Sequence, residues 1–302
     1  MRRREHNNEG FSLPEMMVSM VILLIVTSVA LSALYYSQKI YGSQQLQADM
    51  HAGLRISFEL MTQEIGQAGA LSLAPKTLSA AVTASGSAQT VTISSAANIF
   101  VGEKLTVDTT SGQETVQVTA IPSSTQISGI FTKSHASGAA VVALGVFPQG
   151  VLSGSTATAL KLFGDINGDG SLAYVRYDCD TAAGTLTRSI TTVAPGVTVQ
   201  NPPQILLNNL IANPDGTPCI QYGATTTVTV GATTYTFIPS LAISLTVRTS
   251  KIDPQTGAFG TLTKSFSNLA SRNVLAGITM AQASPAVTVR LQPTPPGLPL
   301  TP

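Results

Sequence analysis

The most prominent feature of the chain is an apolar run near its beginning. From Met16 to Tyr36 the sequence is apolar apart from serine and threonine residues, and as a helix it would span roughly 31 Å. This length matches the hydrocarbon core of a bilayer, so the run predicts a transmembrane helix. Arg2, Arg3 and Arg4 precede the run, which predicts an amino terminus left in the cytoplasm.

A second hydrophobic pattern follows the apolar run. After Tyr41, apolar residues recur with the spacing of one buried helix face: Leu46, Met50, Leu54, Phe58, Met61, Ile65 and Ala68. The opposite side is expected to carry the polar residues Gln44, Gln47, Asp49, Arg55, Glu59, Gln63 and Glu64. Joined to the apolar run, this segment predicts one helix from about Leu13 to Ala68, ended near Gly69 and Pro75. A soluble amphipathic helix would explain the stripe but not its fusion to a membrane span.

Beyond Ala70 the pattern predicts short β-strands and no helix. Alternating apolar and polar runs are separated by turn signals about every ten residues. The expected strands are Thr90–Ser94, Lys104–Asp108, Glu114–Ala120, Ala139–Leu144, Leu172–Tyr177, Gly184–Ser189, Pro203–Leu210, Leu241–Val247 and Gly260–Phe266. We interpret residues 76–147 as an inserted β-module, residues 159–290 as a β-rich head, and the proline-rich residues 291–302 as a mobile tail.

Composition narrows the possible classes of function. Charged residues make up 10% of the chain, and its formal net charge is +1. The chain therefore lacks the basic footprint of a nucleic-acid-binding protein. Its sequence also lacks the motifs of phosphate-binding loops, serine hydrolases and zinc proteases, and His6, His51 and His135 lie far apart along it. We expect no enzymatic activity.

The residues around the start of the apolar run indicate an unusual leader. An ordinary signal peptide is cut after its apolar segment, whereas the small residue Gly10 lies before it. Glu15 places a lone carboxylate at the edge of the membrane helix, which costs a few kcal/mol unless the charge is paired. A newly freed α-amino group of a neighbouring subunit would be a suitable partner.

The run Gly10-Phe11-Ser12-Leu13-Pro14-Glu15 resembles the class III leader of type IV prepilins and type II secretion pseudopilins. This resemblance implies that a prepilin peptidase removes residues 1–10 by cutting between Gly10 and Phe11, and that Phe11 is then N-methylated. It also implies that Glu15, the fifth residue of the mature chain, pairs with the amino terminus of an adjacent subunit. Pro14 replaces the usual aliphatic residue, but proline is tolerated in a first helical turn.

Later segments resemble W-type minor pilins (PilW-like): Leu54–Gly69, Leu186–Ser189, Leu206–Leu210 and Ser271–Val274. The resemblance implies an α+β fold. A long N-terminal membrane-spanning helix, with a transmembrane half at 11–36 and an amphipathic half at 37–70, would pack on a β-rich pilin-like head that carries the inserted small β-module.

The two resemblances together imply a minor pilin that acts in pilus assembly or initiation as a tip or low-copy subunit. Its head would lie in the periplasm while the helix is anchored in the bacterial inner membrane, and it would then join other pilins in the filament. A J-type pseudopilin of a type II secretion system is one alternative. A membrane-anchored adhesin or binding module is another.

The chain has two cysteines, Cys179 and Cys219. In an exported protein they could form a disulfide that closes a loop of forty residues. The alternative is a pair of buried free thiols.

An Asp-rich segment follows the ligand spacing of the first half of a calcium loop. Its oxygen ligands would be Asp165, Asn167, Asp169 and Ser171. Arg176 stands where the last acidic ligand of such a loop is expected. The alternative is a tight turn, because Asn-Gly and Asp-Gly pairs favour turns before a strand.

Overall fold

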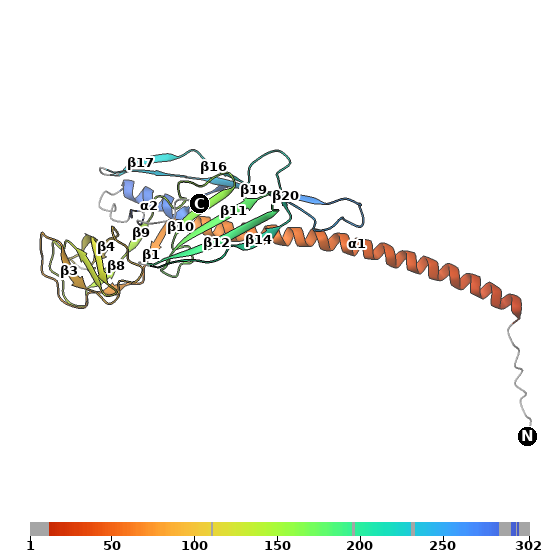
Figure 1. Ribbon diagram of the computed structural model, residues 1–302, viewed down its shortest axis with the longest axis horizontal. Coiled ribbons are helices and arrows are strands. Elements are labelled where there is room, and N and C mark those ends of the chain that lie inside the picture. The colour runs from red at the N-terminus through yellow and green to blue at the C-terminus, as the bar shows by residue number, and fades with distance from the viewer. Residues whose placement is uncertain are drawn as a thin grey trace, which may run out of the picture. The chain divides into compact units, whose positions relative to one another are not determined.

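The computed structural model of the protein describes residues 12–109, 111–194, 197–230, 233–283, 291–293 and 295. The chain divides into two compact units. One unit comprises residues 1–50 and 249–260, and the other comprises residues 51–248 and 261–302. Figure 1 shows the helices and strands of both units.

The two helical patterns form one continuous helix, α1 (Leu13–Gln67), as predicted. In its second half the predicted apolar stripe is buried, and Leu54, Phe58 and Met61 are each at most 2% exposed. The helix is followed by Gly69, whose φ of +80° favours glycine. A Cβ there would also lie 2.3 Å from Val274 Cγ2, so no other residue fits without a shift. The chain therefore leaves α1 at a point where backbone segments pack closely.

The head contains two antiparallel sheets. The first has the order β10-β11-β12-β13, with β14 also paired to β12. Its strands are β10 (Ala159–Gly164), β11 (Leu172–Asp180), β12 (Thr185–Ala194), β13 (Val197–Gln200) and β14 (Gln204–Asn208). The second has the order β15-β19-β16, with β20 paired to β19. Its strands are β15 (Leu210–Ile211), β16 (Ile220–Tyr222), β19 (Leu241–Arg248) and β20 (Thr261–Leu269). A separate hairpin joins β17 (Thr226–Val230) and β18 (Thr233–Phe237).

The segment interpreted as a β-module forms two small sheets. One has the order β2-β8-β4-β5 and the other β3-β7-β6. The strands are β2 (Lys76–Thr77), β3 (Gln89–Thr92), β4 (Lys104–Val107), β5 (Glu114–Gln117), β6 (Ala120–Ser123), β7 (Gln126–Gly129) and β8 (Ala140–Val142). The chain enters the segment through β1 (Ala70–Ser72) and leaves it through β9 (Leu144–Val146), and these two strands pair with each other. Its buried residues form one cluster with Phe163 and Leu172 of the head, so the two parts share a core.

The prediction of no helix beyond Ala70 is wrong, because residues Arg272–Ala283 form a second helix, α2. Val274 and Ile278 are buried on one side of α2, with the spacing of a helix face. A Cβ on Gly277 would lie 2.3 Å from Val146 Cγ2, so glycine allows Val146 of β9 to pack closely. This short helix is stabilised by tertiary contacts, which its own sequence does not reveal.

The proline-rich segment also differs from its prediction as a mobile tail, at its first two residues. Leu291 forms a parallel bridge with Val146, and both Leu291 and Gln292 are buried. The Gln292 side chain accepts a hydrogen bond from the Lys104 backbone N–H and donates one to the Lys104 carbonyl, both at 2.9 Å. These bonds satisfy the backbone at the beginning of β4, which explains why this glutamine is ordered.

Candidate functional site

The amino-terminal end of α1 is held by a capping interaction between Ser12 and Glu15. The backbone N–H of Ser12 donates to Glu15 Oε2 at 3.2 Å, and its hydroxyl donates to the same oxygen at 3.0 Å. The first helical hydrogen bond runs from Met16 N–H to the Ser12 carbonyl. The Glu15 carboxylate therefore stabilises a helix start that would otherwise leave N–H groups unpaired. Pro14 lies inside this first turn, where its missing N–H breaks no helical bond.

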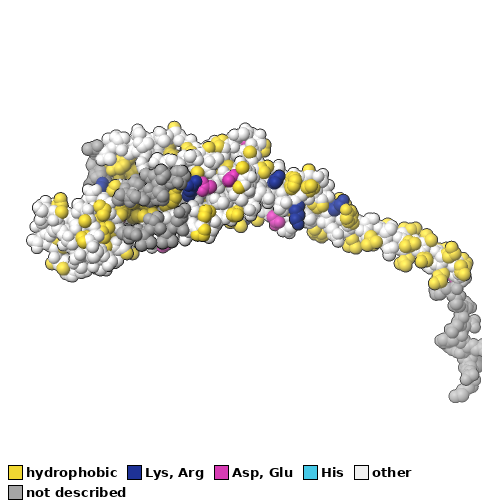
Figure 2. Space-filling model, viewed as in Figure 1, with side chains coloured by type: hydrophobic (Ala, Val, Ile, Leu, Met, Phe, Trp, Pro, Cys, Tyr) yellow, Lys and Arg dark blue, Asp and Glu magenta, His cyan; other side chains and the backbone are white. Residues whose placement is uncertain are grey.

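The first half of α1 exposes an apolar surface. Within α1, an 18-residue window with a mean hydropathy of 2.5 has none of its residues buried, and it is long and apolar enough to cross a membrane. Figure 2 shows hydrophobic side chains along this part of the helix. Its hydroxyl groups bond back to helix carbonyls: Ser19 to Met16, Thr27 to Leu23, and Ser32 to Ser28. These polar groups therefore need no water, which suits a helix surrounded by lipid.

Residues 6–31 match the model of the prokaryotic N-terminal methylation motif. The chain carries a type IV pilin-like leader. The matched residues include Gly10, Phe11 and Glu15 of the predicted processing and assembly site. Gly10 and Phe11 lie outside the residues that the structure describes, whereas Glu15 lies in the first turn of α1. Neither the curated proteins nor the solved structures contain a match to the chain.

A buried ion pair connects the second half of α1 of this pilin-like protein to its first head sheet. Arg188 Nη2 lies 2.5 Å from Glu64 Oε1, and the Tyr177 hydroxyl donates to Glu64 Oε2. Tyr177 on β11 and Arg188 on β12 are directly opposite each other in the sheet register. Burial and the nearby Glu64 raise the pKa of Tyr177, so it stays a donor. Glu64 was expected on the polar side of the helix, but the structure buries it.

The charge of Glu64 explains why sequence periodicity misplaced it. A carboxylate directly before Ile65 looks like part of the solvated face, yet the head sheet covers that flank of the helix as well. Burial lowers the pKa of Arg188, but its hydrogen bonds and electrostatic interactions with Glu64 and Tyr177 together outweigh burial and leave the pKa raised. The partner lies over a hundred residues away in the chain. Arg188 lies in the segment Leu186–Ser189 that resembles W-type minor pilins, but no sequence pattern pairs it with Glu64.

The structure joins Cys179 of β11 and Cys219 in a disulfide, with their Cα atoms 6.5 Å apart. Cys219 directly precedes β16 of the second head sheet. The bridge therefore connects the two head sheets, in addition to closing a loop between residues 40 positions apart.

The Asp-rich segment is the loop between β10 and β11, and its carboxylates bond to the backbone of the loop. Asp165 accepts hydrogen bonds from the N–H groups of Asp169 and Gly170, both at 3.1 Å. Asp169 Oδ1 accepts a third bond from the Ser171 N–H. Burial raises the pKa of Asp165, although its hydrogen bond from Gly170 opposes the shift. These contacts are those of a tight turn. Among the described residues, no three His, Cys, Asp or Glu side chains are grouped so that they could hold a metal ion.

The calcium alternative can be separated from the turn by thermal unfolding. If Asp165, Asn167 and Asp169 form only a turn, millimolar Ca²⁺ should leave the Tm of the full-length protein unchanged. Asp165→Ala should then destabilise the protein by about 1–3 kcal/mol with and without calcium, because it leaves buried N–H groups unpaired. A Tm that rises with Ca²⁺ in the parent and not in Asp165→Ala would instead establish a calcium site. Asp215→Ala, in an exposed turn, is the matched control.

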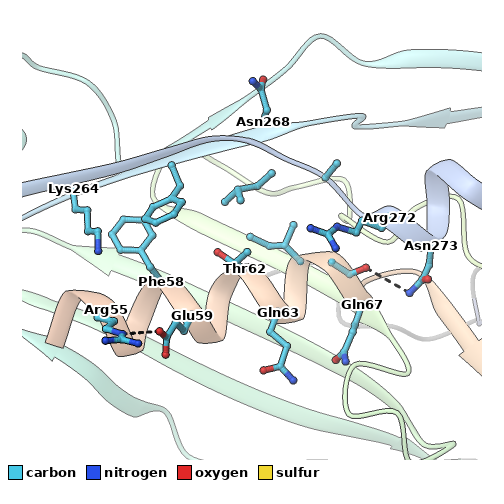
Figure 3. Close-up of a pocket in the computed structure, with 15 residues that line it drawn as sticks. Arg55, Phe58, Glu59, Thr62, Gln63, Gln67, Lys264, Asn268, Arg272 and Asn273 are labelled. Carbon is cyan, nitrogen blue, oxygen red and sulfur yellow. Dashed lines mark hydrogen bonds and ion pairs between the residues drawn. The ribbon is translucent and has the colours of Figure 1, made fainter. Parts of the chain in front are cut away.

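A groove of about 950 Å³ lies between the end of α1 and the segment from β20 to α2. The rings of Phe58 and Phe266 form its floor, with ring centroids 4.7 Å apart. Figure 3 shows Phe58 on α1. Lys264 points from β20 toward α1, whereas Asn268 points away from it. Among its lining residues, Arg55 pairs with Glu59 at 2.8 Å, and Lys264 and Arg272 are further cations. The groove is therefore basic with an apolar floor, and its lining contains no Cys, His or Ser that could act as a nucleophile or base.

Glu103 and His135 are buried in the β-module. The sequence patterns singled out neither Glu103 nor Glu114, the partner of His135. Glu103 is fully buried; its Oε2 accepts a hydrogen bond from the Phe100 N–H at 3.0 Å, while its Oε1 has no hydrogen-bond partner among the described residues. Burial raises the pKa of Glu103 to about 8, against the effect of the Phe100 bond. His135 Nε2 lies 2.6 Å from Glu114 Oε1. Burial raises the pKa of Glu114, but the bonds from Thr132 and His135 outweigh it and leave the pKa lowered.

Proposed function

We propose that the chain is a W-type minor pilin of a type IV pilus, a tip or low-copy subunit that acts in pilus assembly or initiation. The observation that carries this proposal is the N-terminal methylation motif at residues 6–31, continued by an exposed apolar helix and a β-rich head. The W type is supported by two of the head segments that resemble it, Leu186–Ser189 and Leu206–Leu210. They lie on paired strands, with Leu186 of β12 opposite Leu207 of β14.

The proposed processing prepares the amino terminus for assembly. A prepilin peptidase in the inner membrane would remove residues 1–10 and leave Phe11 as a methylated first residue, two positions before α1 begins at Leu13. Glu15 uses Oε2 for the Ser12 cap, and among the described residues its Oε1 accepts no hydrogen bond. This second oxygen can therefore accept a bond from the α-amino group of a neighbouring pilin while the cap stays intact. Pairing would offset the few kcal/mol that a lone carboxylate costs at the membrane.

Mass spectrometry of the amino terminus from purified membranes tests the processing step. We expect a mature chain that starts at Phe11 and carries one additional methyl group. Gly10→Val should block cleavage, because the small residue at the cleavage site is lost, and should leave the leader attached. Glu15→Gln should be cleaved normally but should fail to enter filaments. A parent protein that retains Met1, or one cut near Ala33, would contradict the proposal.

The two alternatives predict different phenotypes for a deletion strain. Loss of a minor pilin should sharply reduce the number of pili per cell. Loss of a J-type pseudopilin should leave pili intact and stop export through the type II secretion system. An anchored adhesin or binding module should leave both pili and secretion unchanged and should be absent from purified filaments.

A further inference from the structure

The loop that joins β19 to β20, residues 249–260, lies along α1. Near its tip, Ser43 Oγ donates a buried hydrogen bond of 2.9 Å to Asp253 Oδ2. A Cβ on Gly42 would lie 3.2 Å from Pro254 Cγ, so proline packs directly on the helix there. At the base, a Cβ on Gly260 would lie 3.8 Å from Met50 Cε. The loop thus extends about 12 Å along the helix, from the level of Met50 back toward the apolar span.

The loop is built as an ordered turn. The Asp253 N–H donates to the Ala258 carbonyl at 2.9 Å, and the Gly257 N–H donates to the Asp253 carbonyl at 2.8 Å. The Gln255 N–H donates to Asp253 Oδ1 at 2.8 Å and lowers the pKa of this carboxylate. The Asp253 carboxylate is therefore ionised and buried, and both of its oxygens accept hydrogen bonds inside the unit. The charge that the loop presents to its surroundings comes from Lys251, which is exposed.

The exposed surface around this loop has the composition of a membrane interface. Ile252 of the loop is 56% exposed and Phe259 is 46% exposed. On the helix, Tyr36 and Tyr41 are exposed, and Lys39 Nζ lies 4.7 Å from the centre of the Tyr35 ring. Tyrosine and lysine side chains gather where hydrocarbon meets the polar headgroups.

The distances place the loop tip at the outer edge of the headgroup layer, within reach of its side chains. Gly42 follows Tyr36, the last residue of the apolar run, by about 9 Å of helix. The headgroup layer adds about 5–8 Å to each face of the hydrocarbon core, and side chains at the loop tip reach beyond its backbone. We propose that the loop at residues 249–260 rests on the outer headgroup layer of the inner membrane, with Ile252 at the lipid surface and Lys251 facing anionic headgroups. This inference rests on the proposed anchoring of α1 in that membrane.

Fluorescence quenching in vesicles tests the contact. The full-length protein would be reconstituted in phosphatidylcholine and phosphatidylglycerol vesicles that contain a lipid with a spin-labelled headgroup. A fluorophore would be attached at one introduced cysteine, since both native cysteines form the disulfide. Ile252→Cys reports on the loop, Tyr36→Cys on the end of the apolar run, and Ala48→Cys on an exposed helix position near the level of the loop base.

We expect quenching at Ile252→Cys to approach that at Tyr36→Cys and to exceed that at Ala48→Cys several-fold. Equal quenching at positions 252 and 48, with strong quenching at position 36, would overturn the loop contact and leave the anchored helix standing. Weak quenching at all three positions would place α1 outside the bilayer and would overturn the proposed function together with the loop contact.

Discussion

Replacing Glu103 with glutamine is expected to stabilise the protein by about 3–5 kcal/mol above pH 8. The pKa of Glu103 rises from an ordinary value of 4.5 to about 8 because its carboxyl is buried in the β-module. Among the described residues, its Oε1 has no hydrogen-bond partner. The folded protein therefore holds a proton that the unfolded chain has already released. The contribution of the protonated Glu103 carboxyl to the free energy of unfolding is fully present below pH 4.5, falls as the pH rises, and is lost above pH 8.

Denaturation of the full-length protein in detergent at a series of pH values would measure this effect. The parent and Glu103→Gln should have similar stabilities near pH 4.5 and should diverge steadily up to about pH 8. Amide exchange in β4 and β5 should show the same divergence, because Glu103 directly precedes β4. Glu59→Gln is the matched control at a largely exposed site, where we expect less than about 1 kcal/mol. Parallel stability curves for the parent and Glu103→Gln would refute the prediction.

Replacing the arginine of the buried ion pair should lower the free energy of unfolding by an amount comparable to the gain expected for Glu103→Gln. Arg188→Met should destabilise the protein by about 3–5 kcal/mol, because it leaves the buried Glu64 carboxylate without its cation. Among the described residues, Tyr177 would then be the remaining hydrogen-bond donor to that carboxylate, and a neutral hydroxyl cannot neutralise its charge. Denaturant unfolding of the full-length protein would give the change in the free energy of unfolding.

An exposed pair on the same helix provides the control for this experiment. Arg55→Met breaks the pair between Arg55 and Glu59, whose side chains are 74% and 63% exposed, and should cost less than about 1 kcal/mol. Adding Glu64→Gln to Arg188→Met should recover much of the lost stability, because the unpaired charge is removed. If both arginine variants lost the same stability, or if the double variant were no better than Arg188→Met, the buried pair would not have the role assigned to it.

The apolar run and the apolar stripe were sufficient to predict α1 to within one residue at its end. Helical periodicity and hydropathy are local properties, and they persist over many turns in this segment. The strand predictions also overlap observed strands, and the clearest of them, Leu241–Val247, corresponds to β19. In contrast, β10 and α2 were missed. All six residues of β10 are buried, so it lacks the alternation of apolar and polar positions that marks a strand, and α2 packs its buried face on β9.

The leader is readable from the sequence because it is a linear motif at the edge of an apolar helix. The residues from Gly10 to Glu15 need no tertiary structure to be recognised. In contrast, the buried Glu64 pairs with Arg188, which lies 124 residues away along the chain. Ser43 likewise bonds to Asp253, 210 residues away. Whether a charged side chain faces water or another chain segment depends on what the fold places beside it. Local patterns therefore determine the anchor and its helix, and only the folded head decides which polar residues are buried and paired.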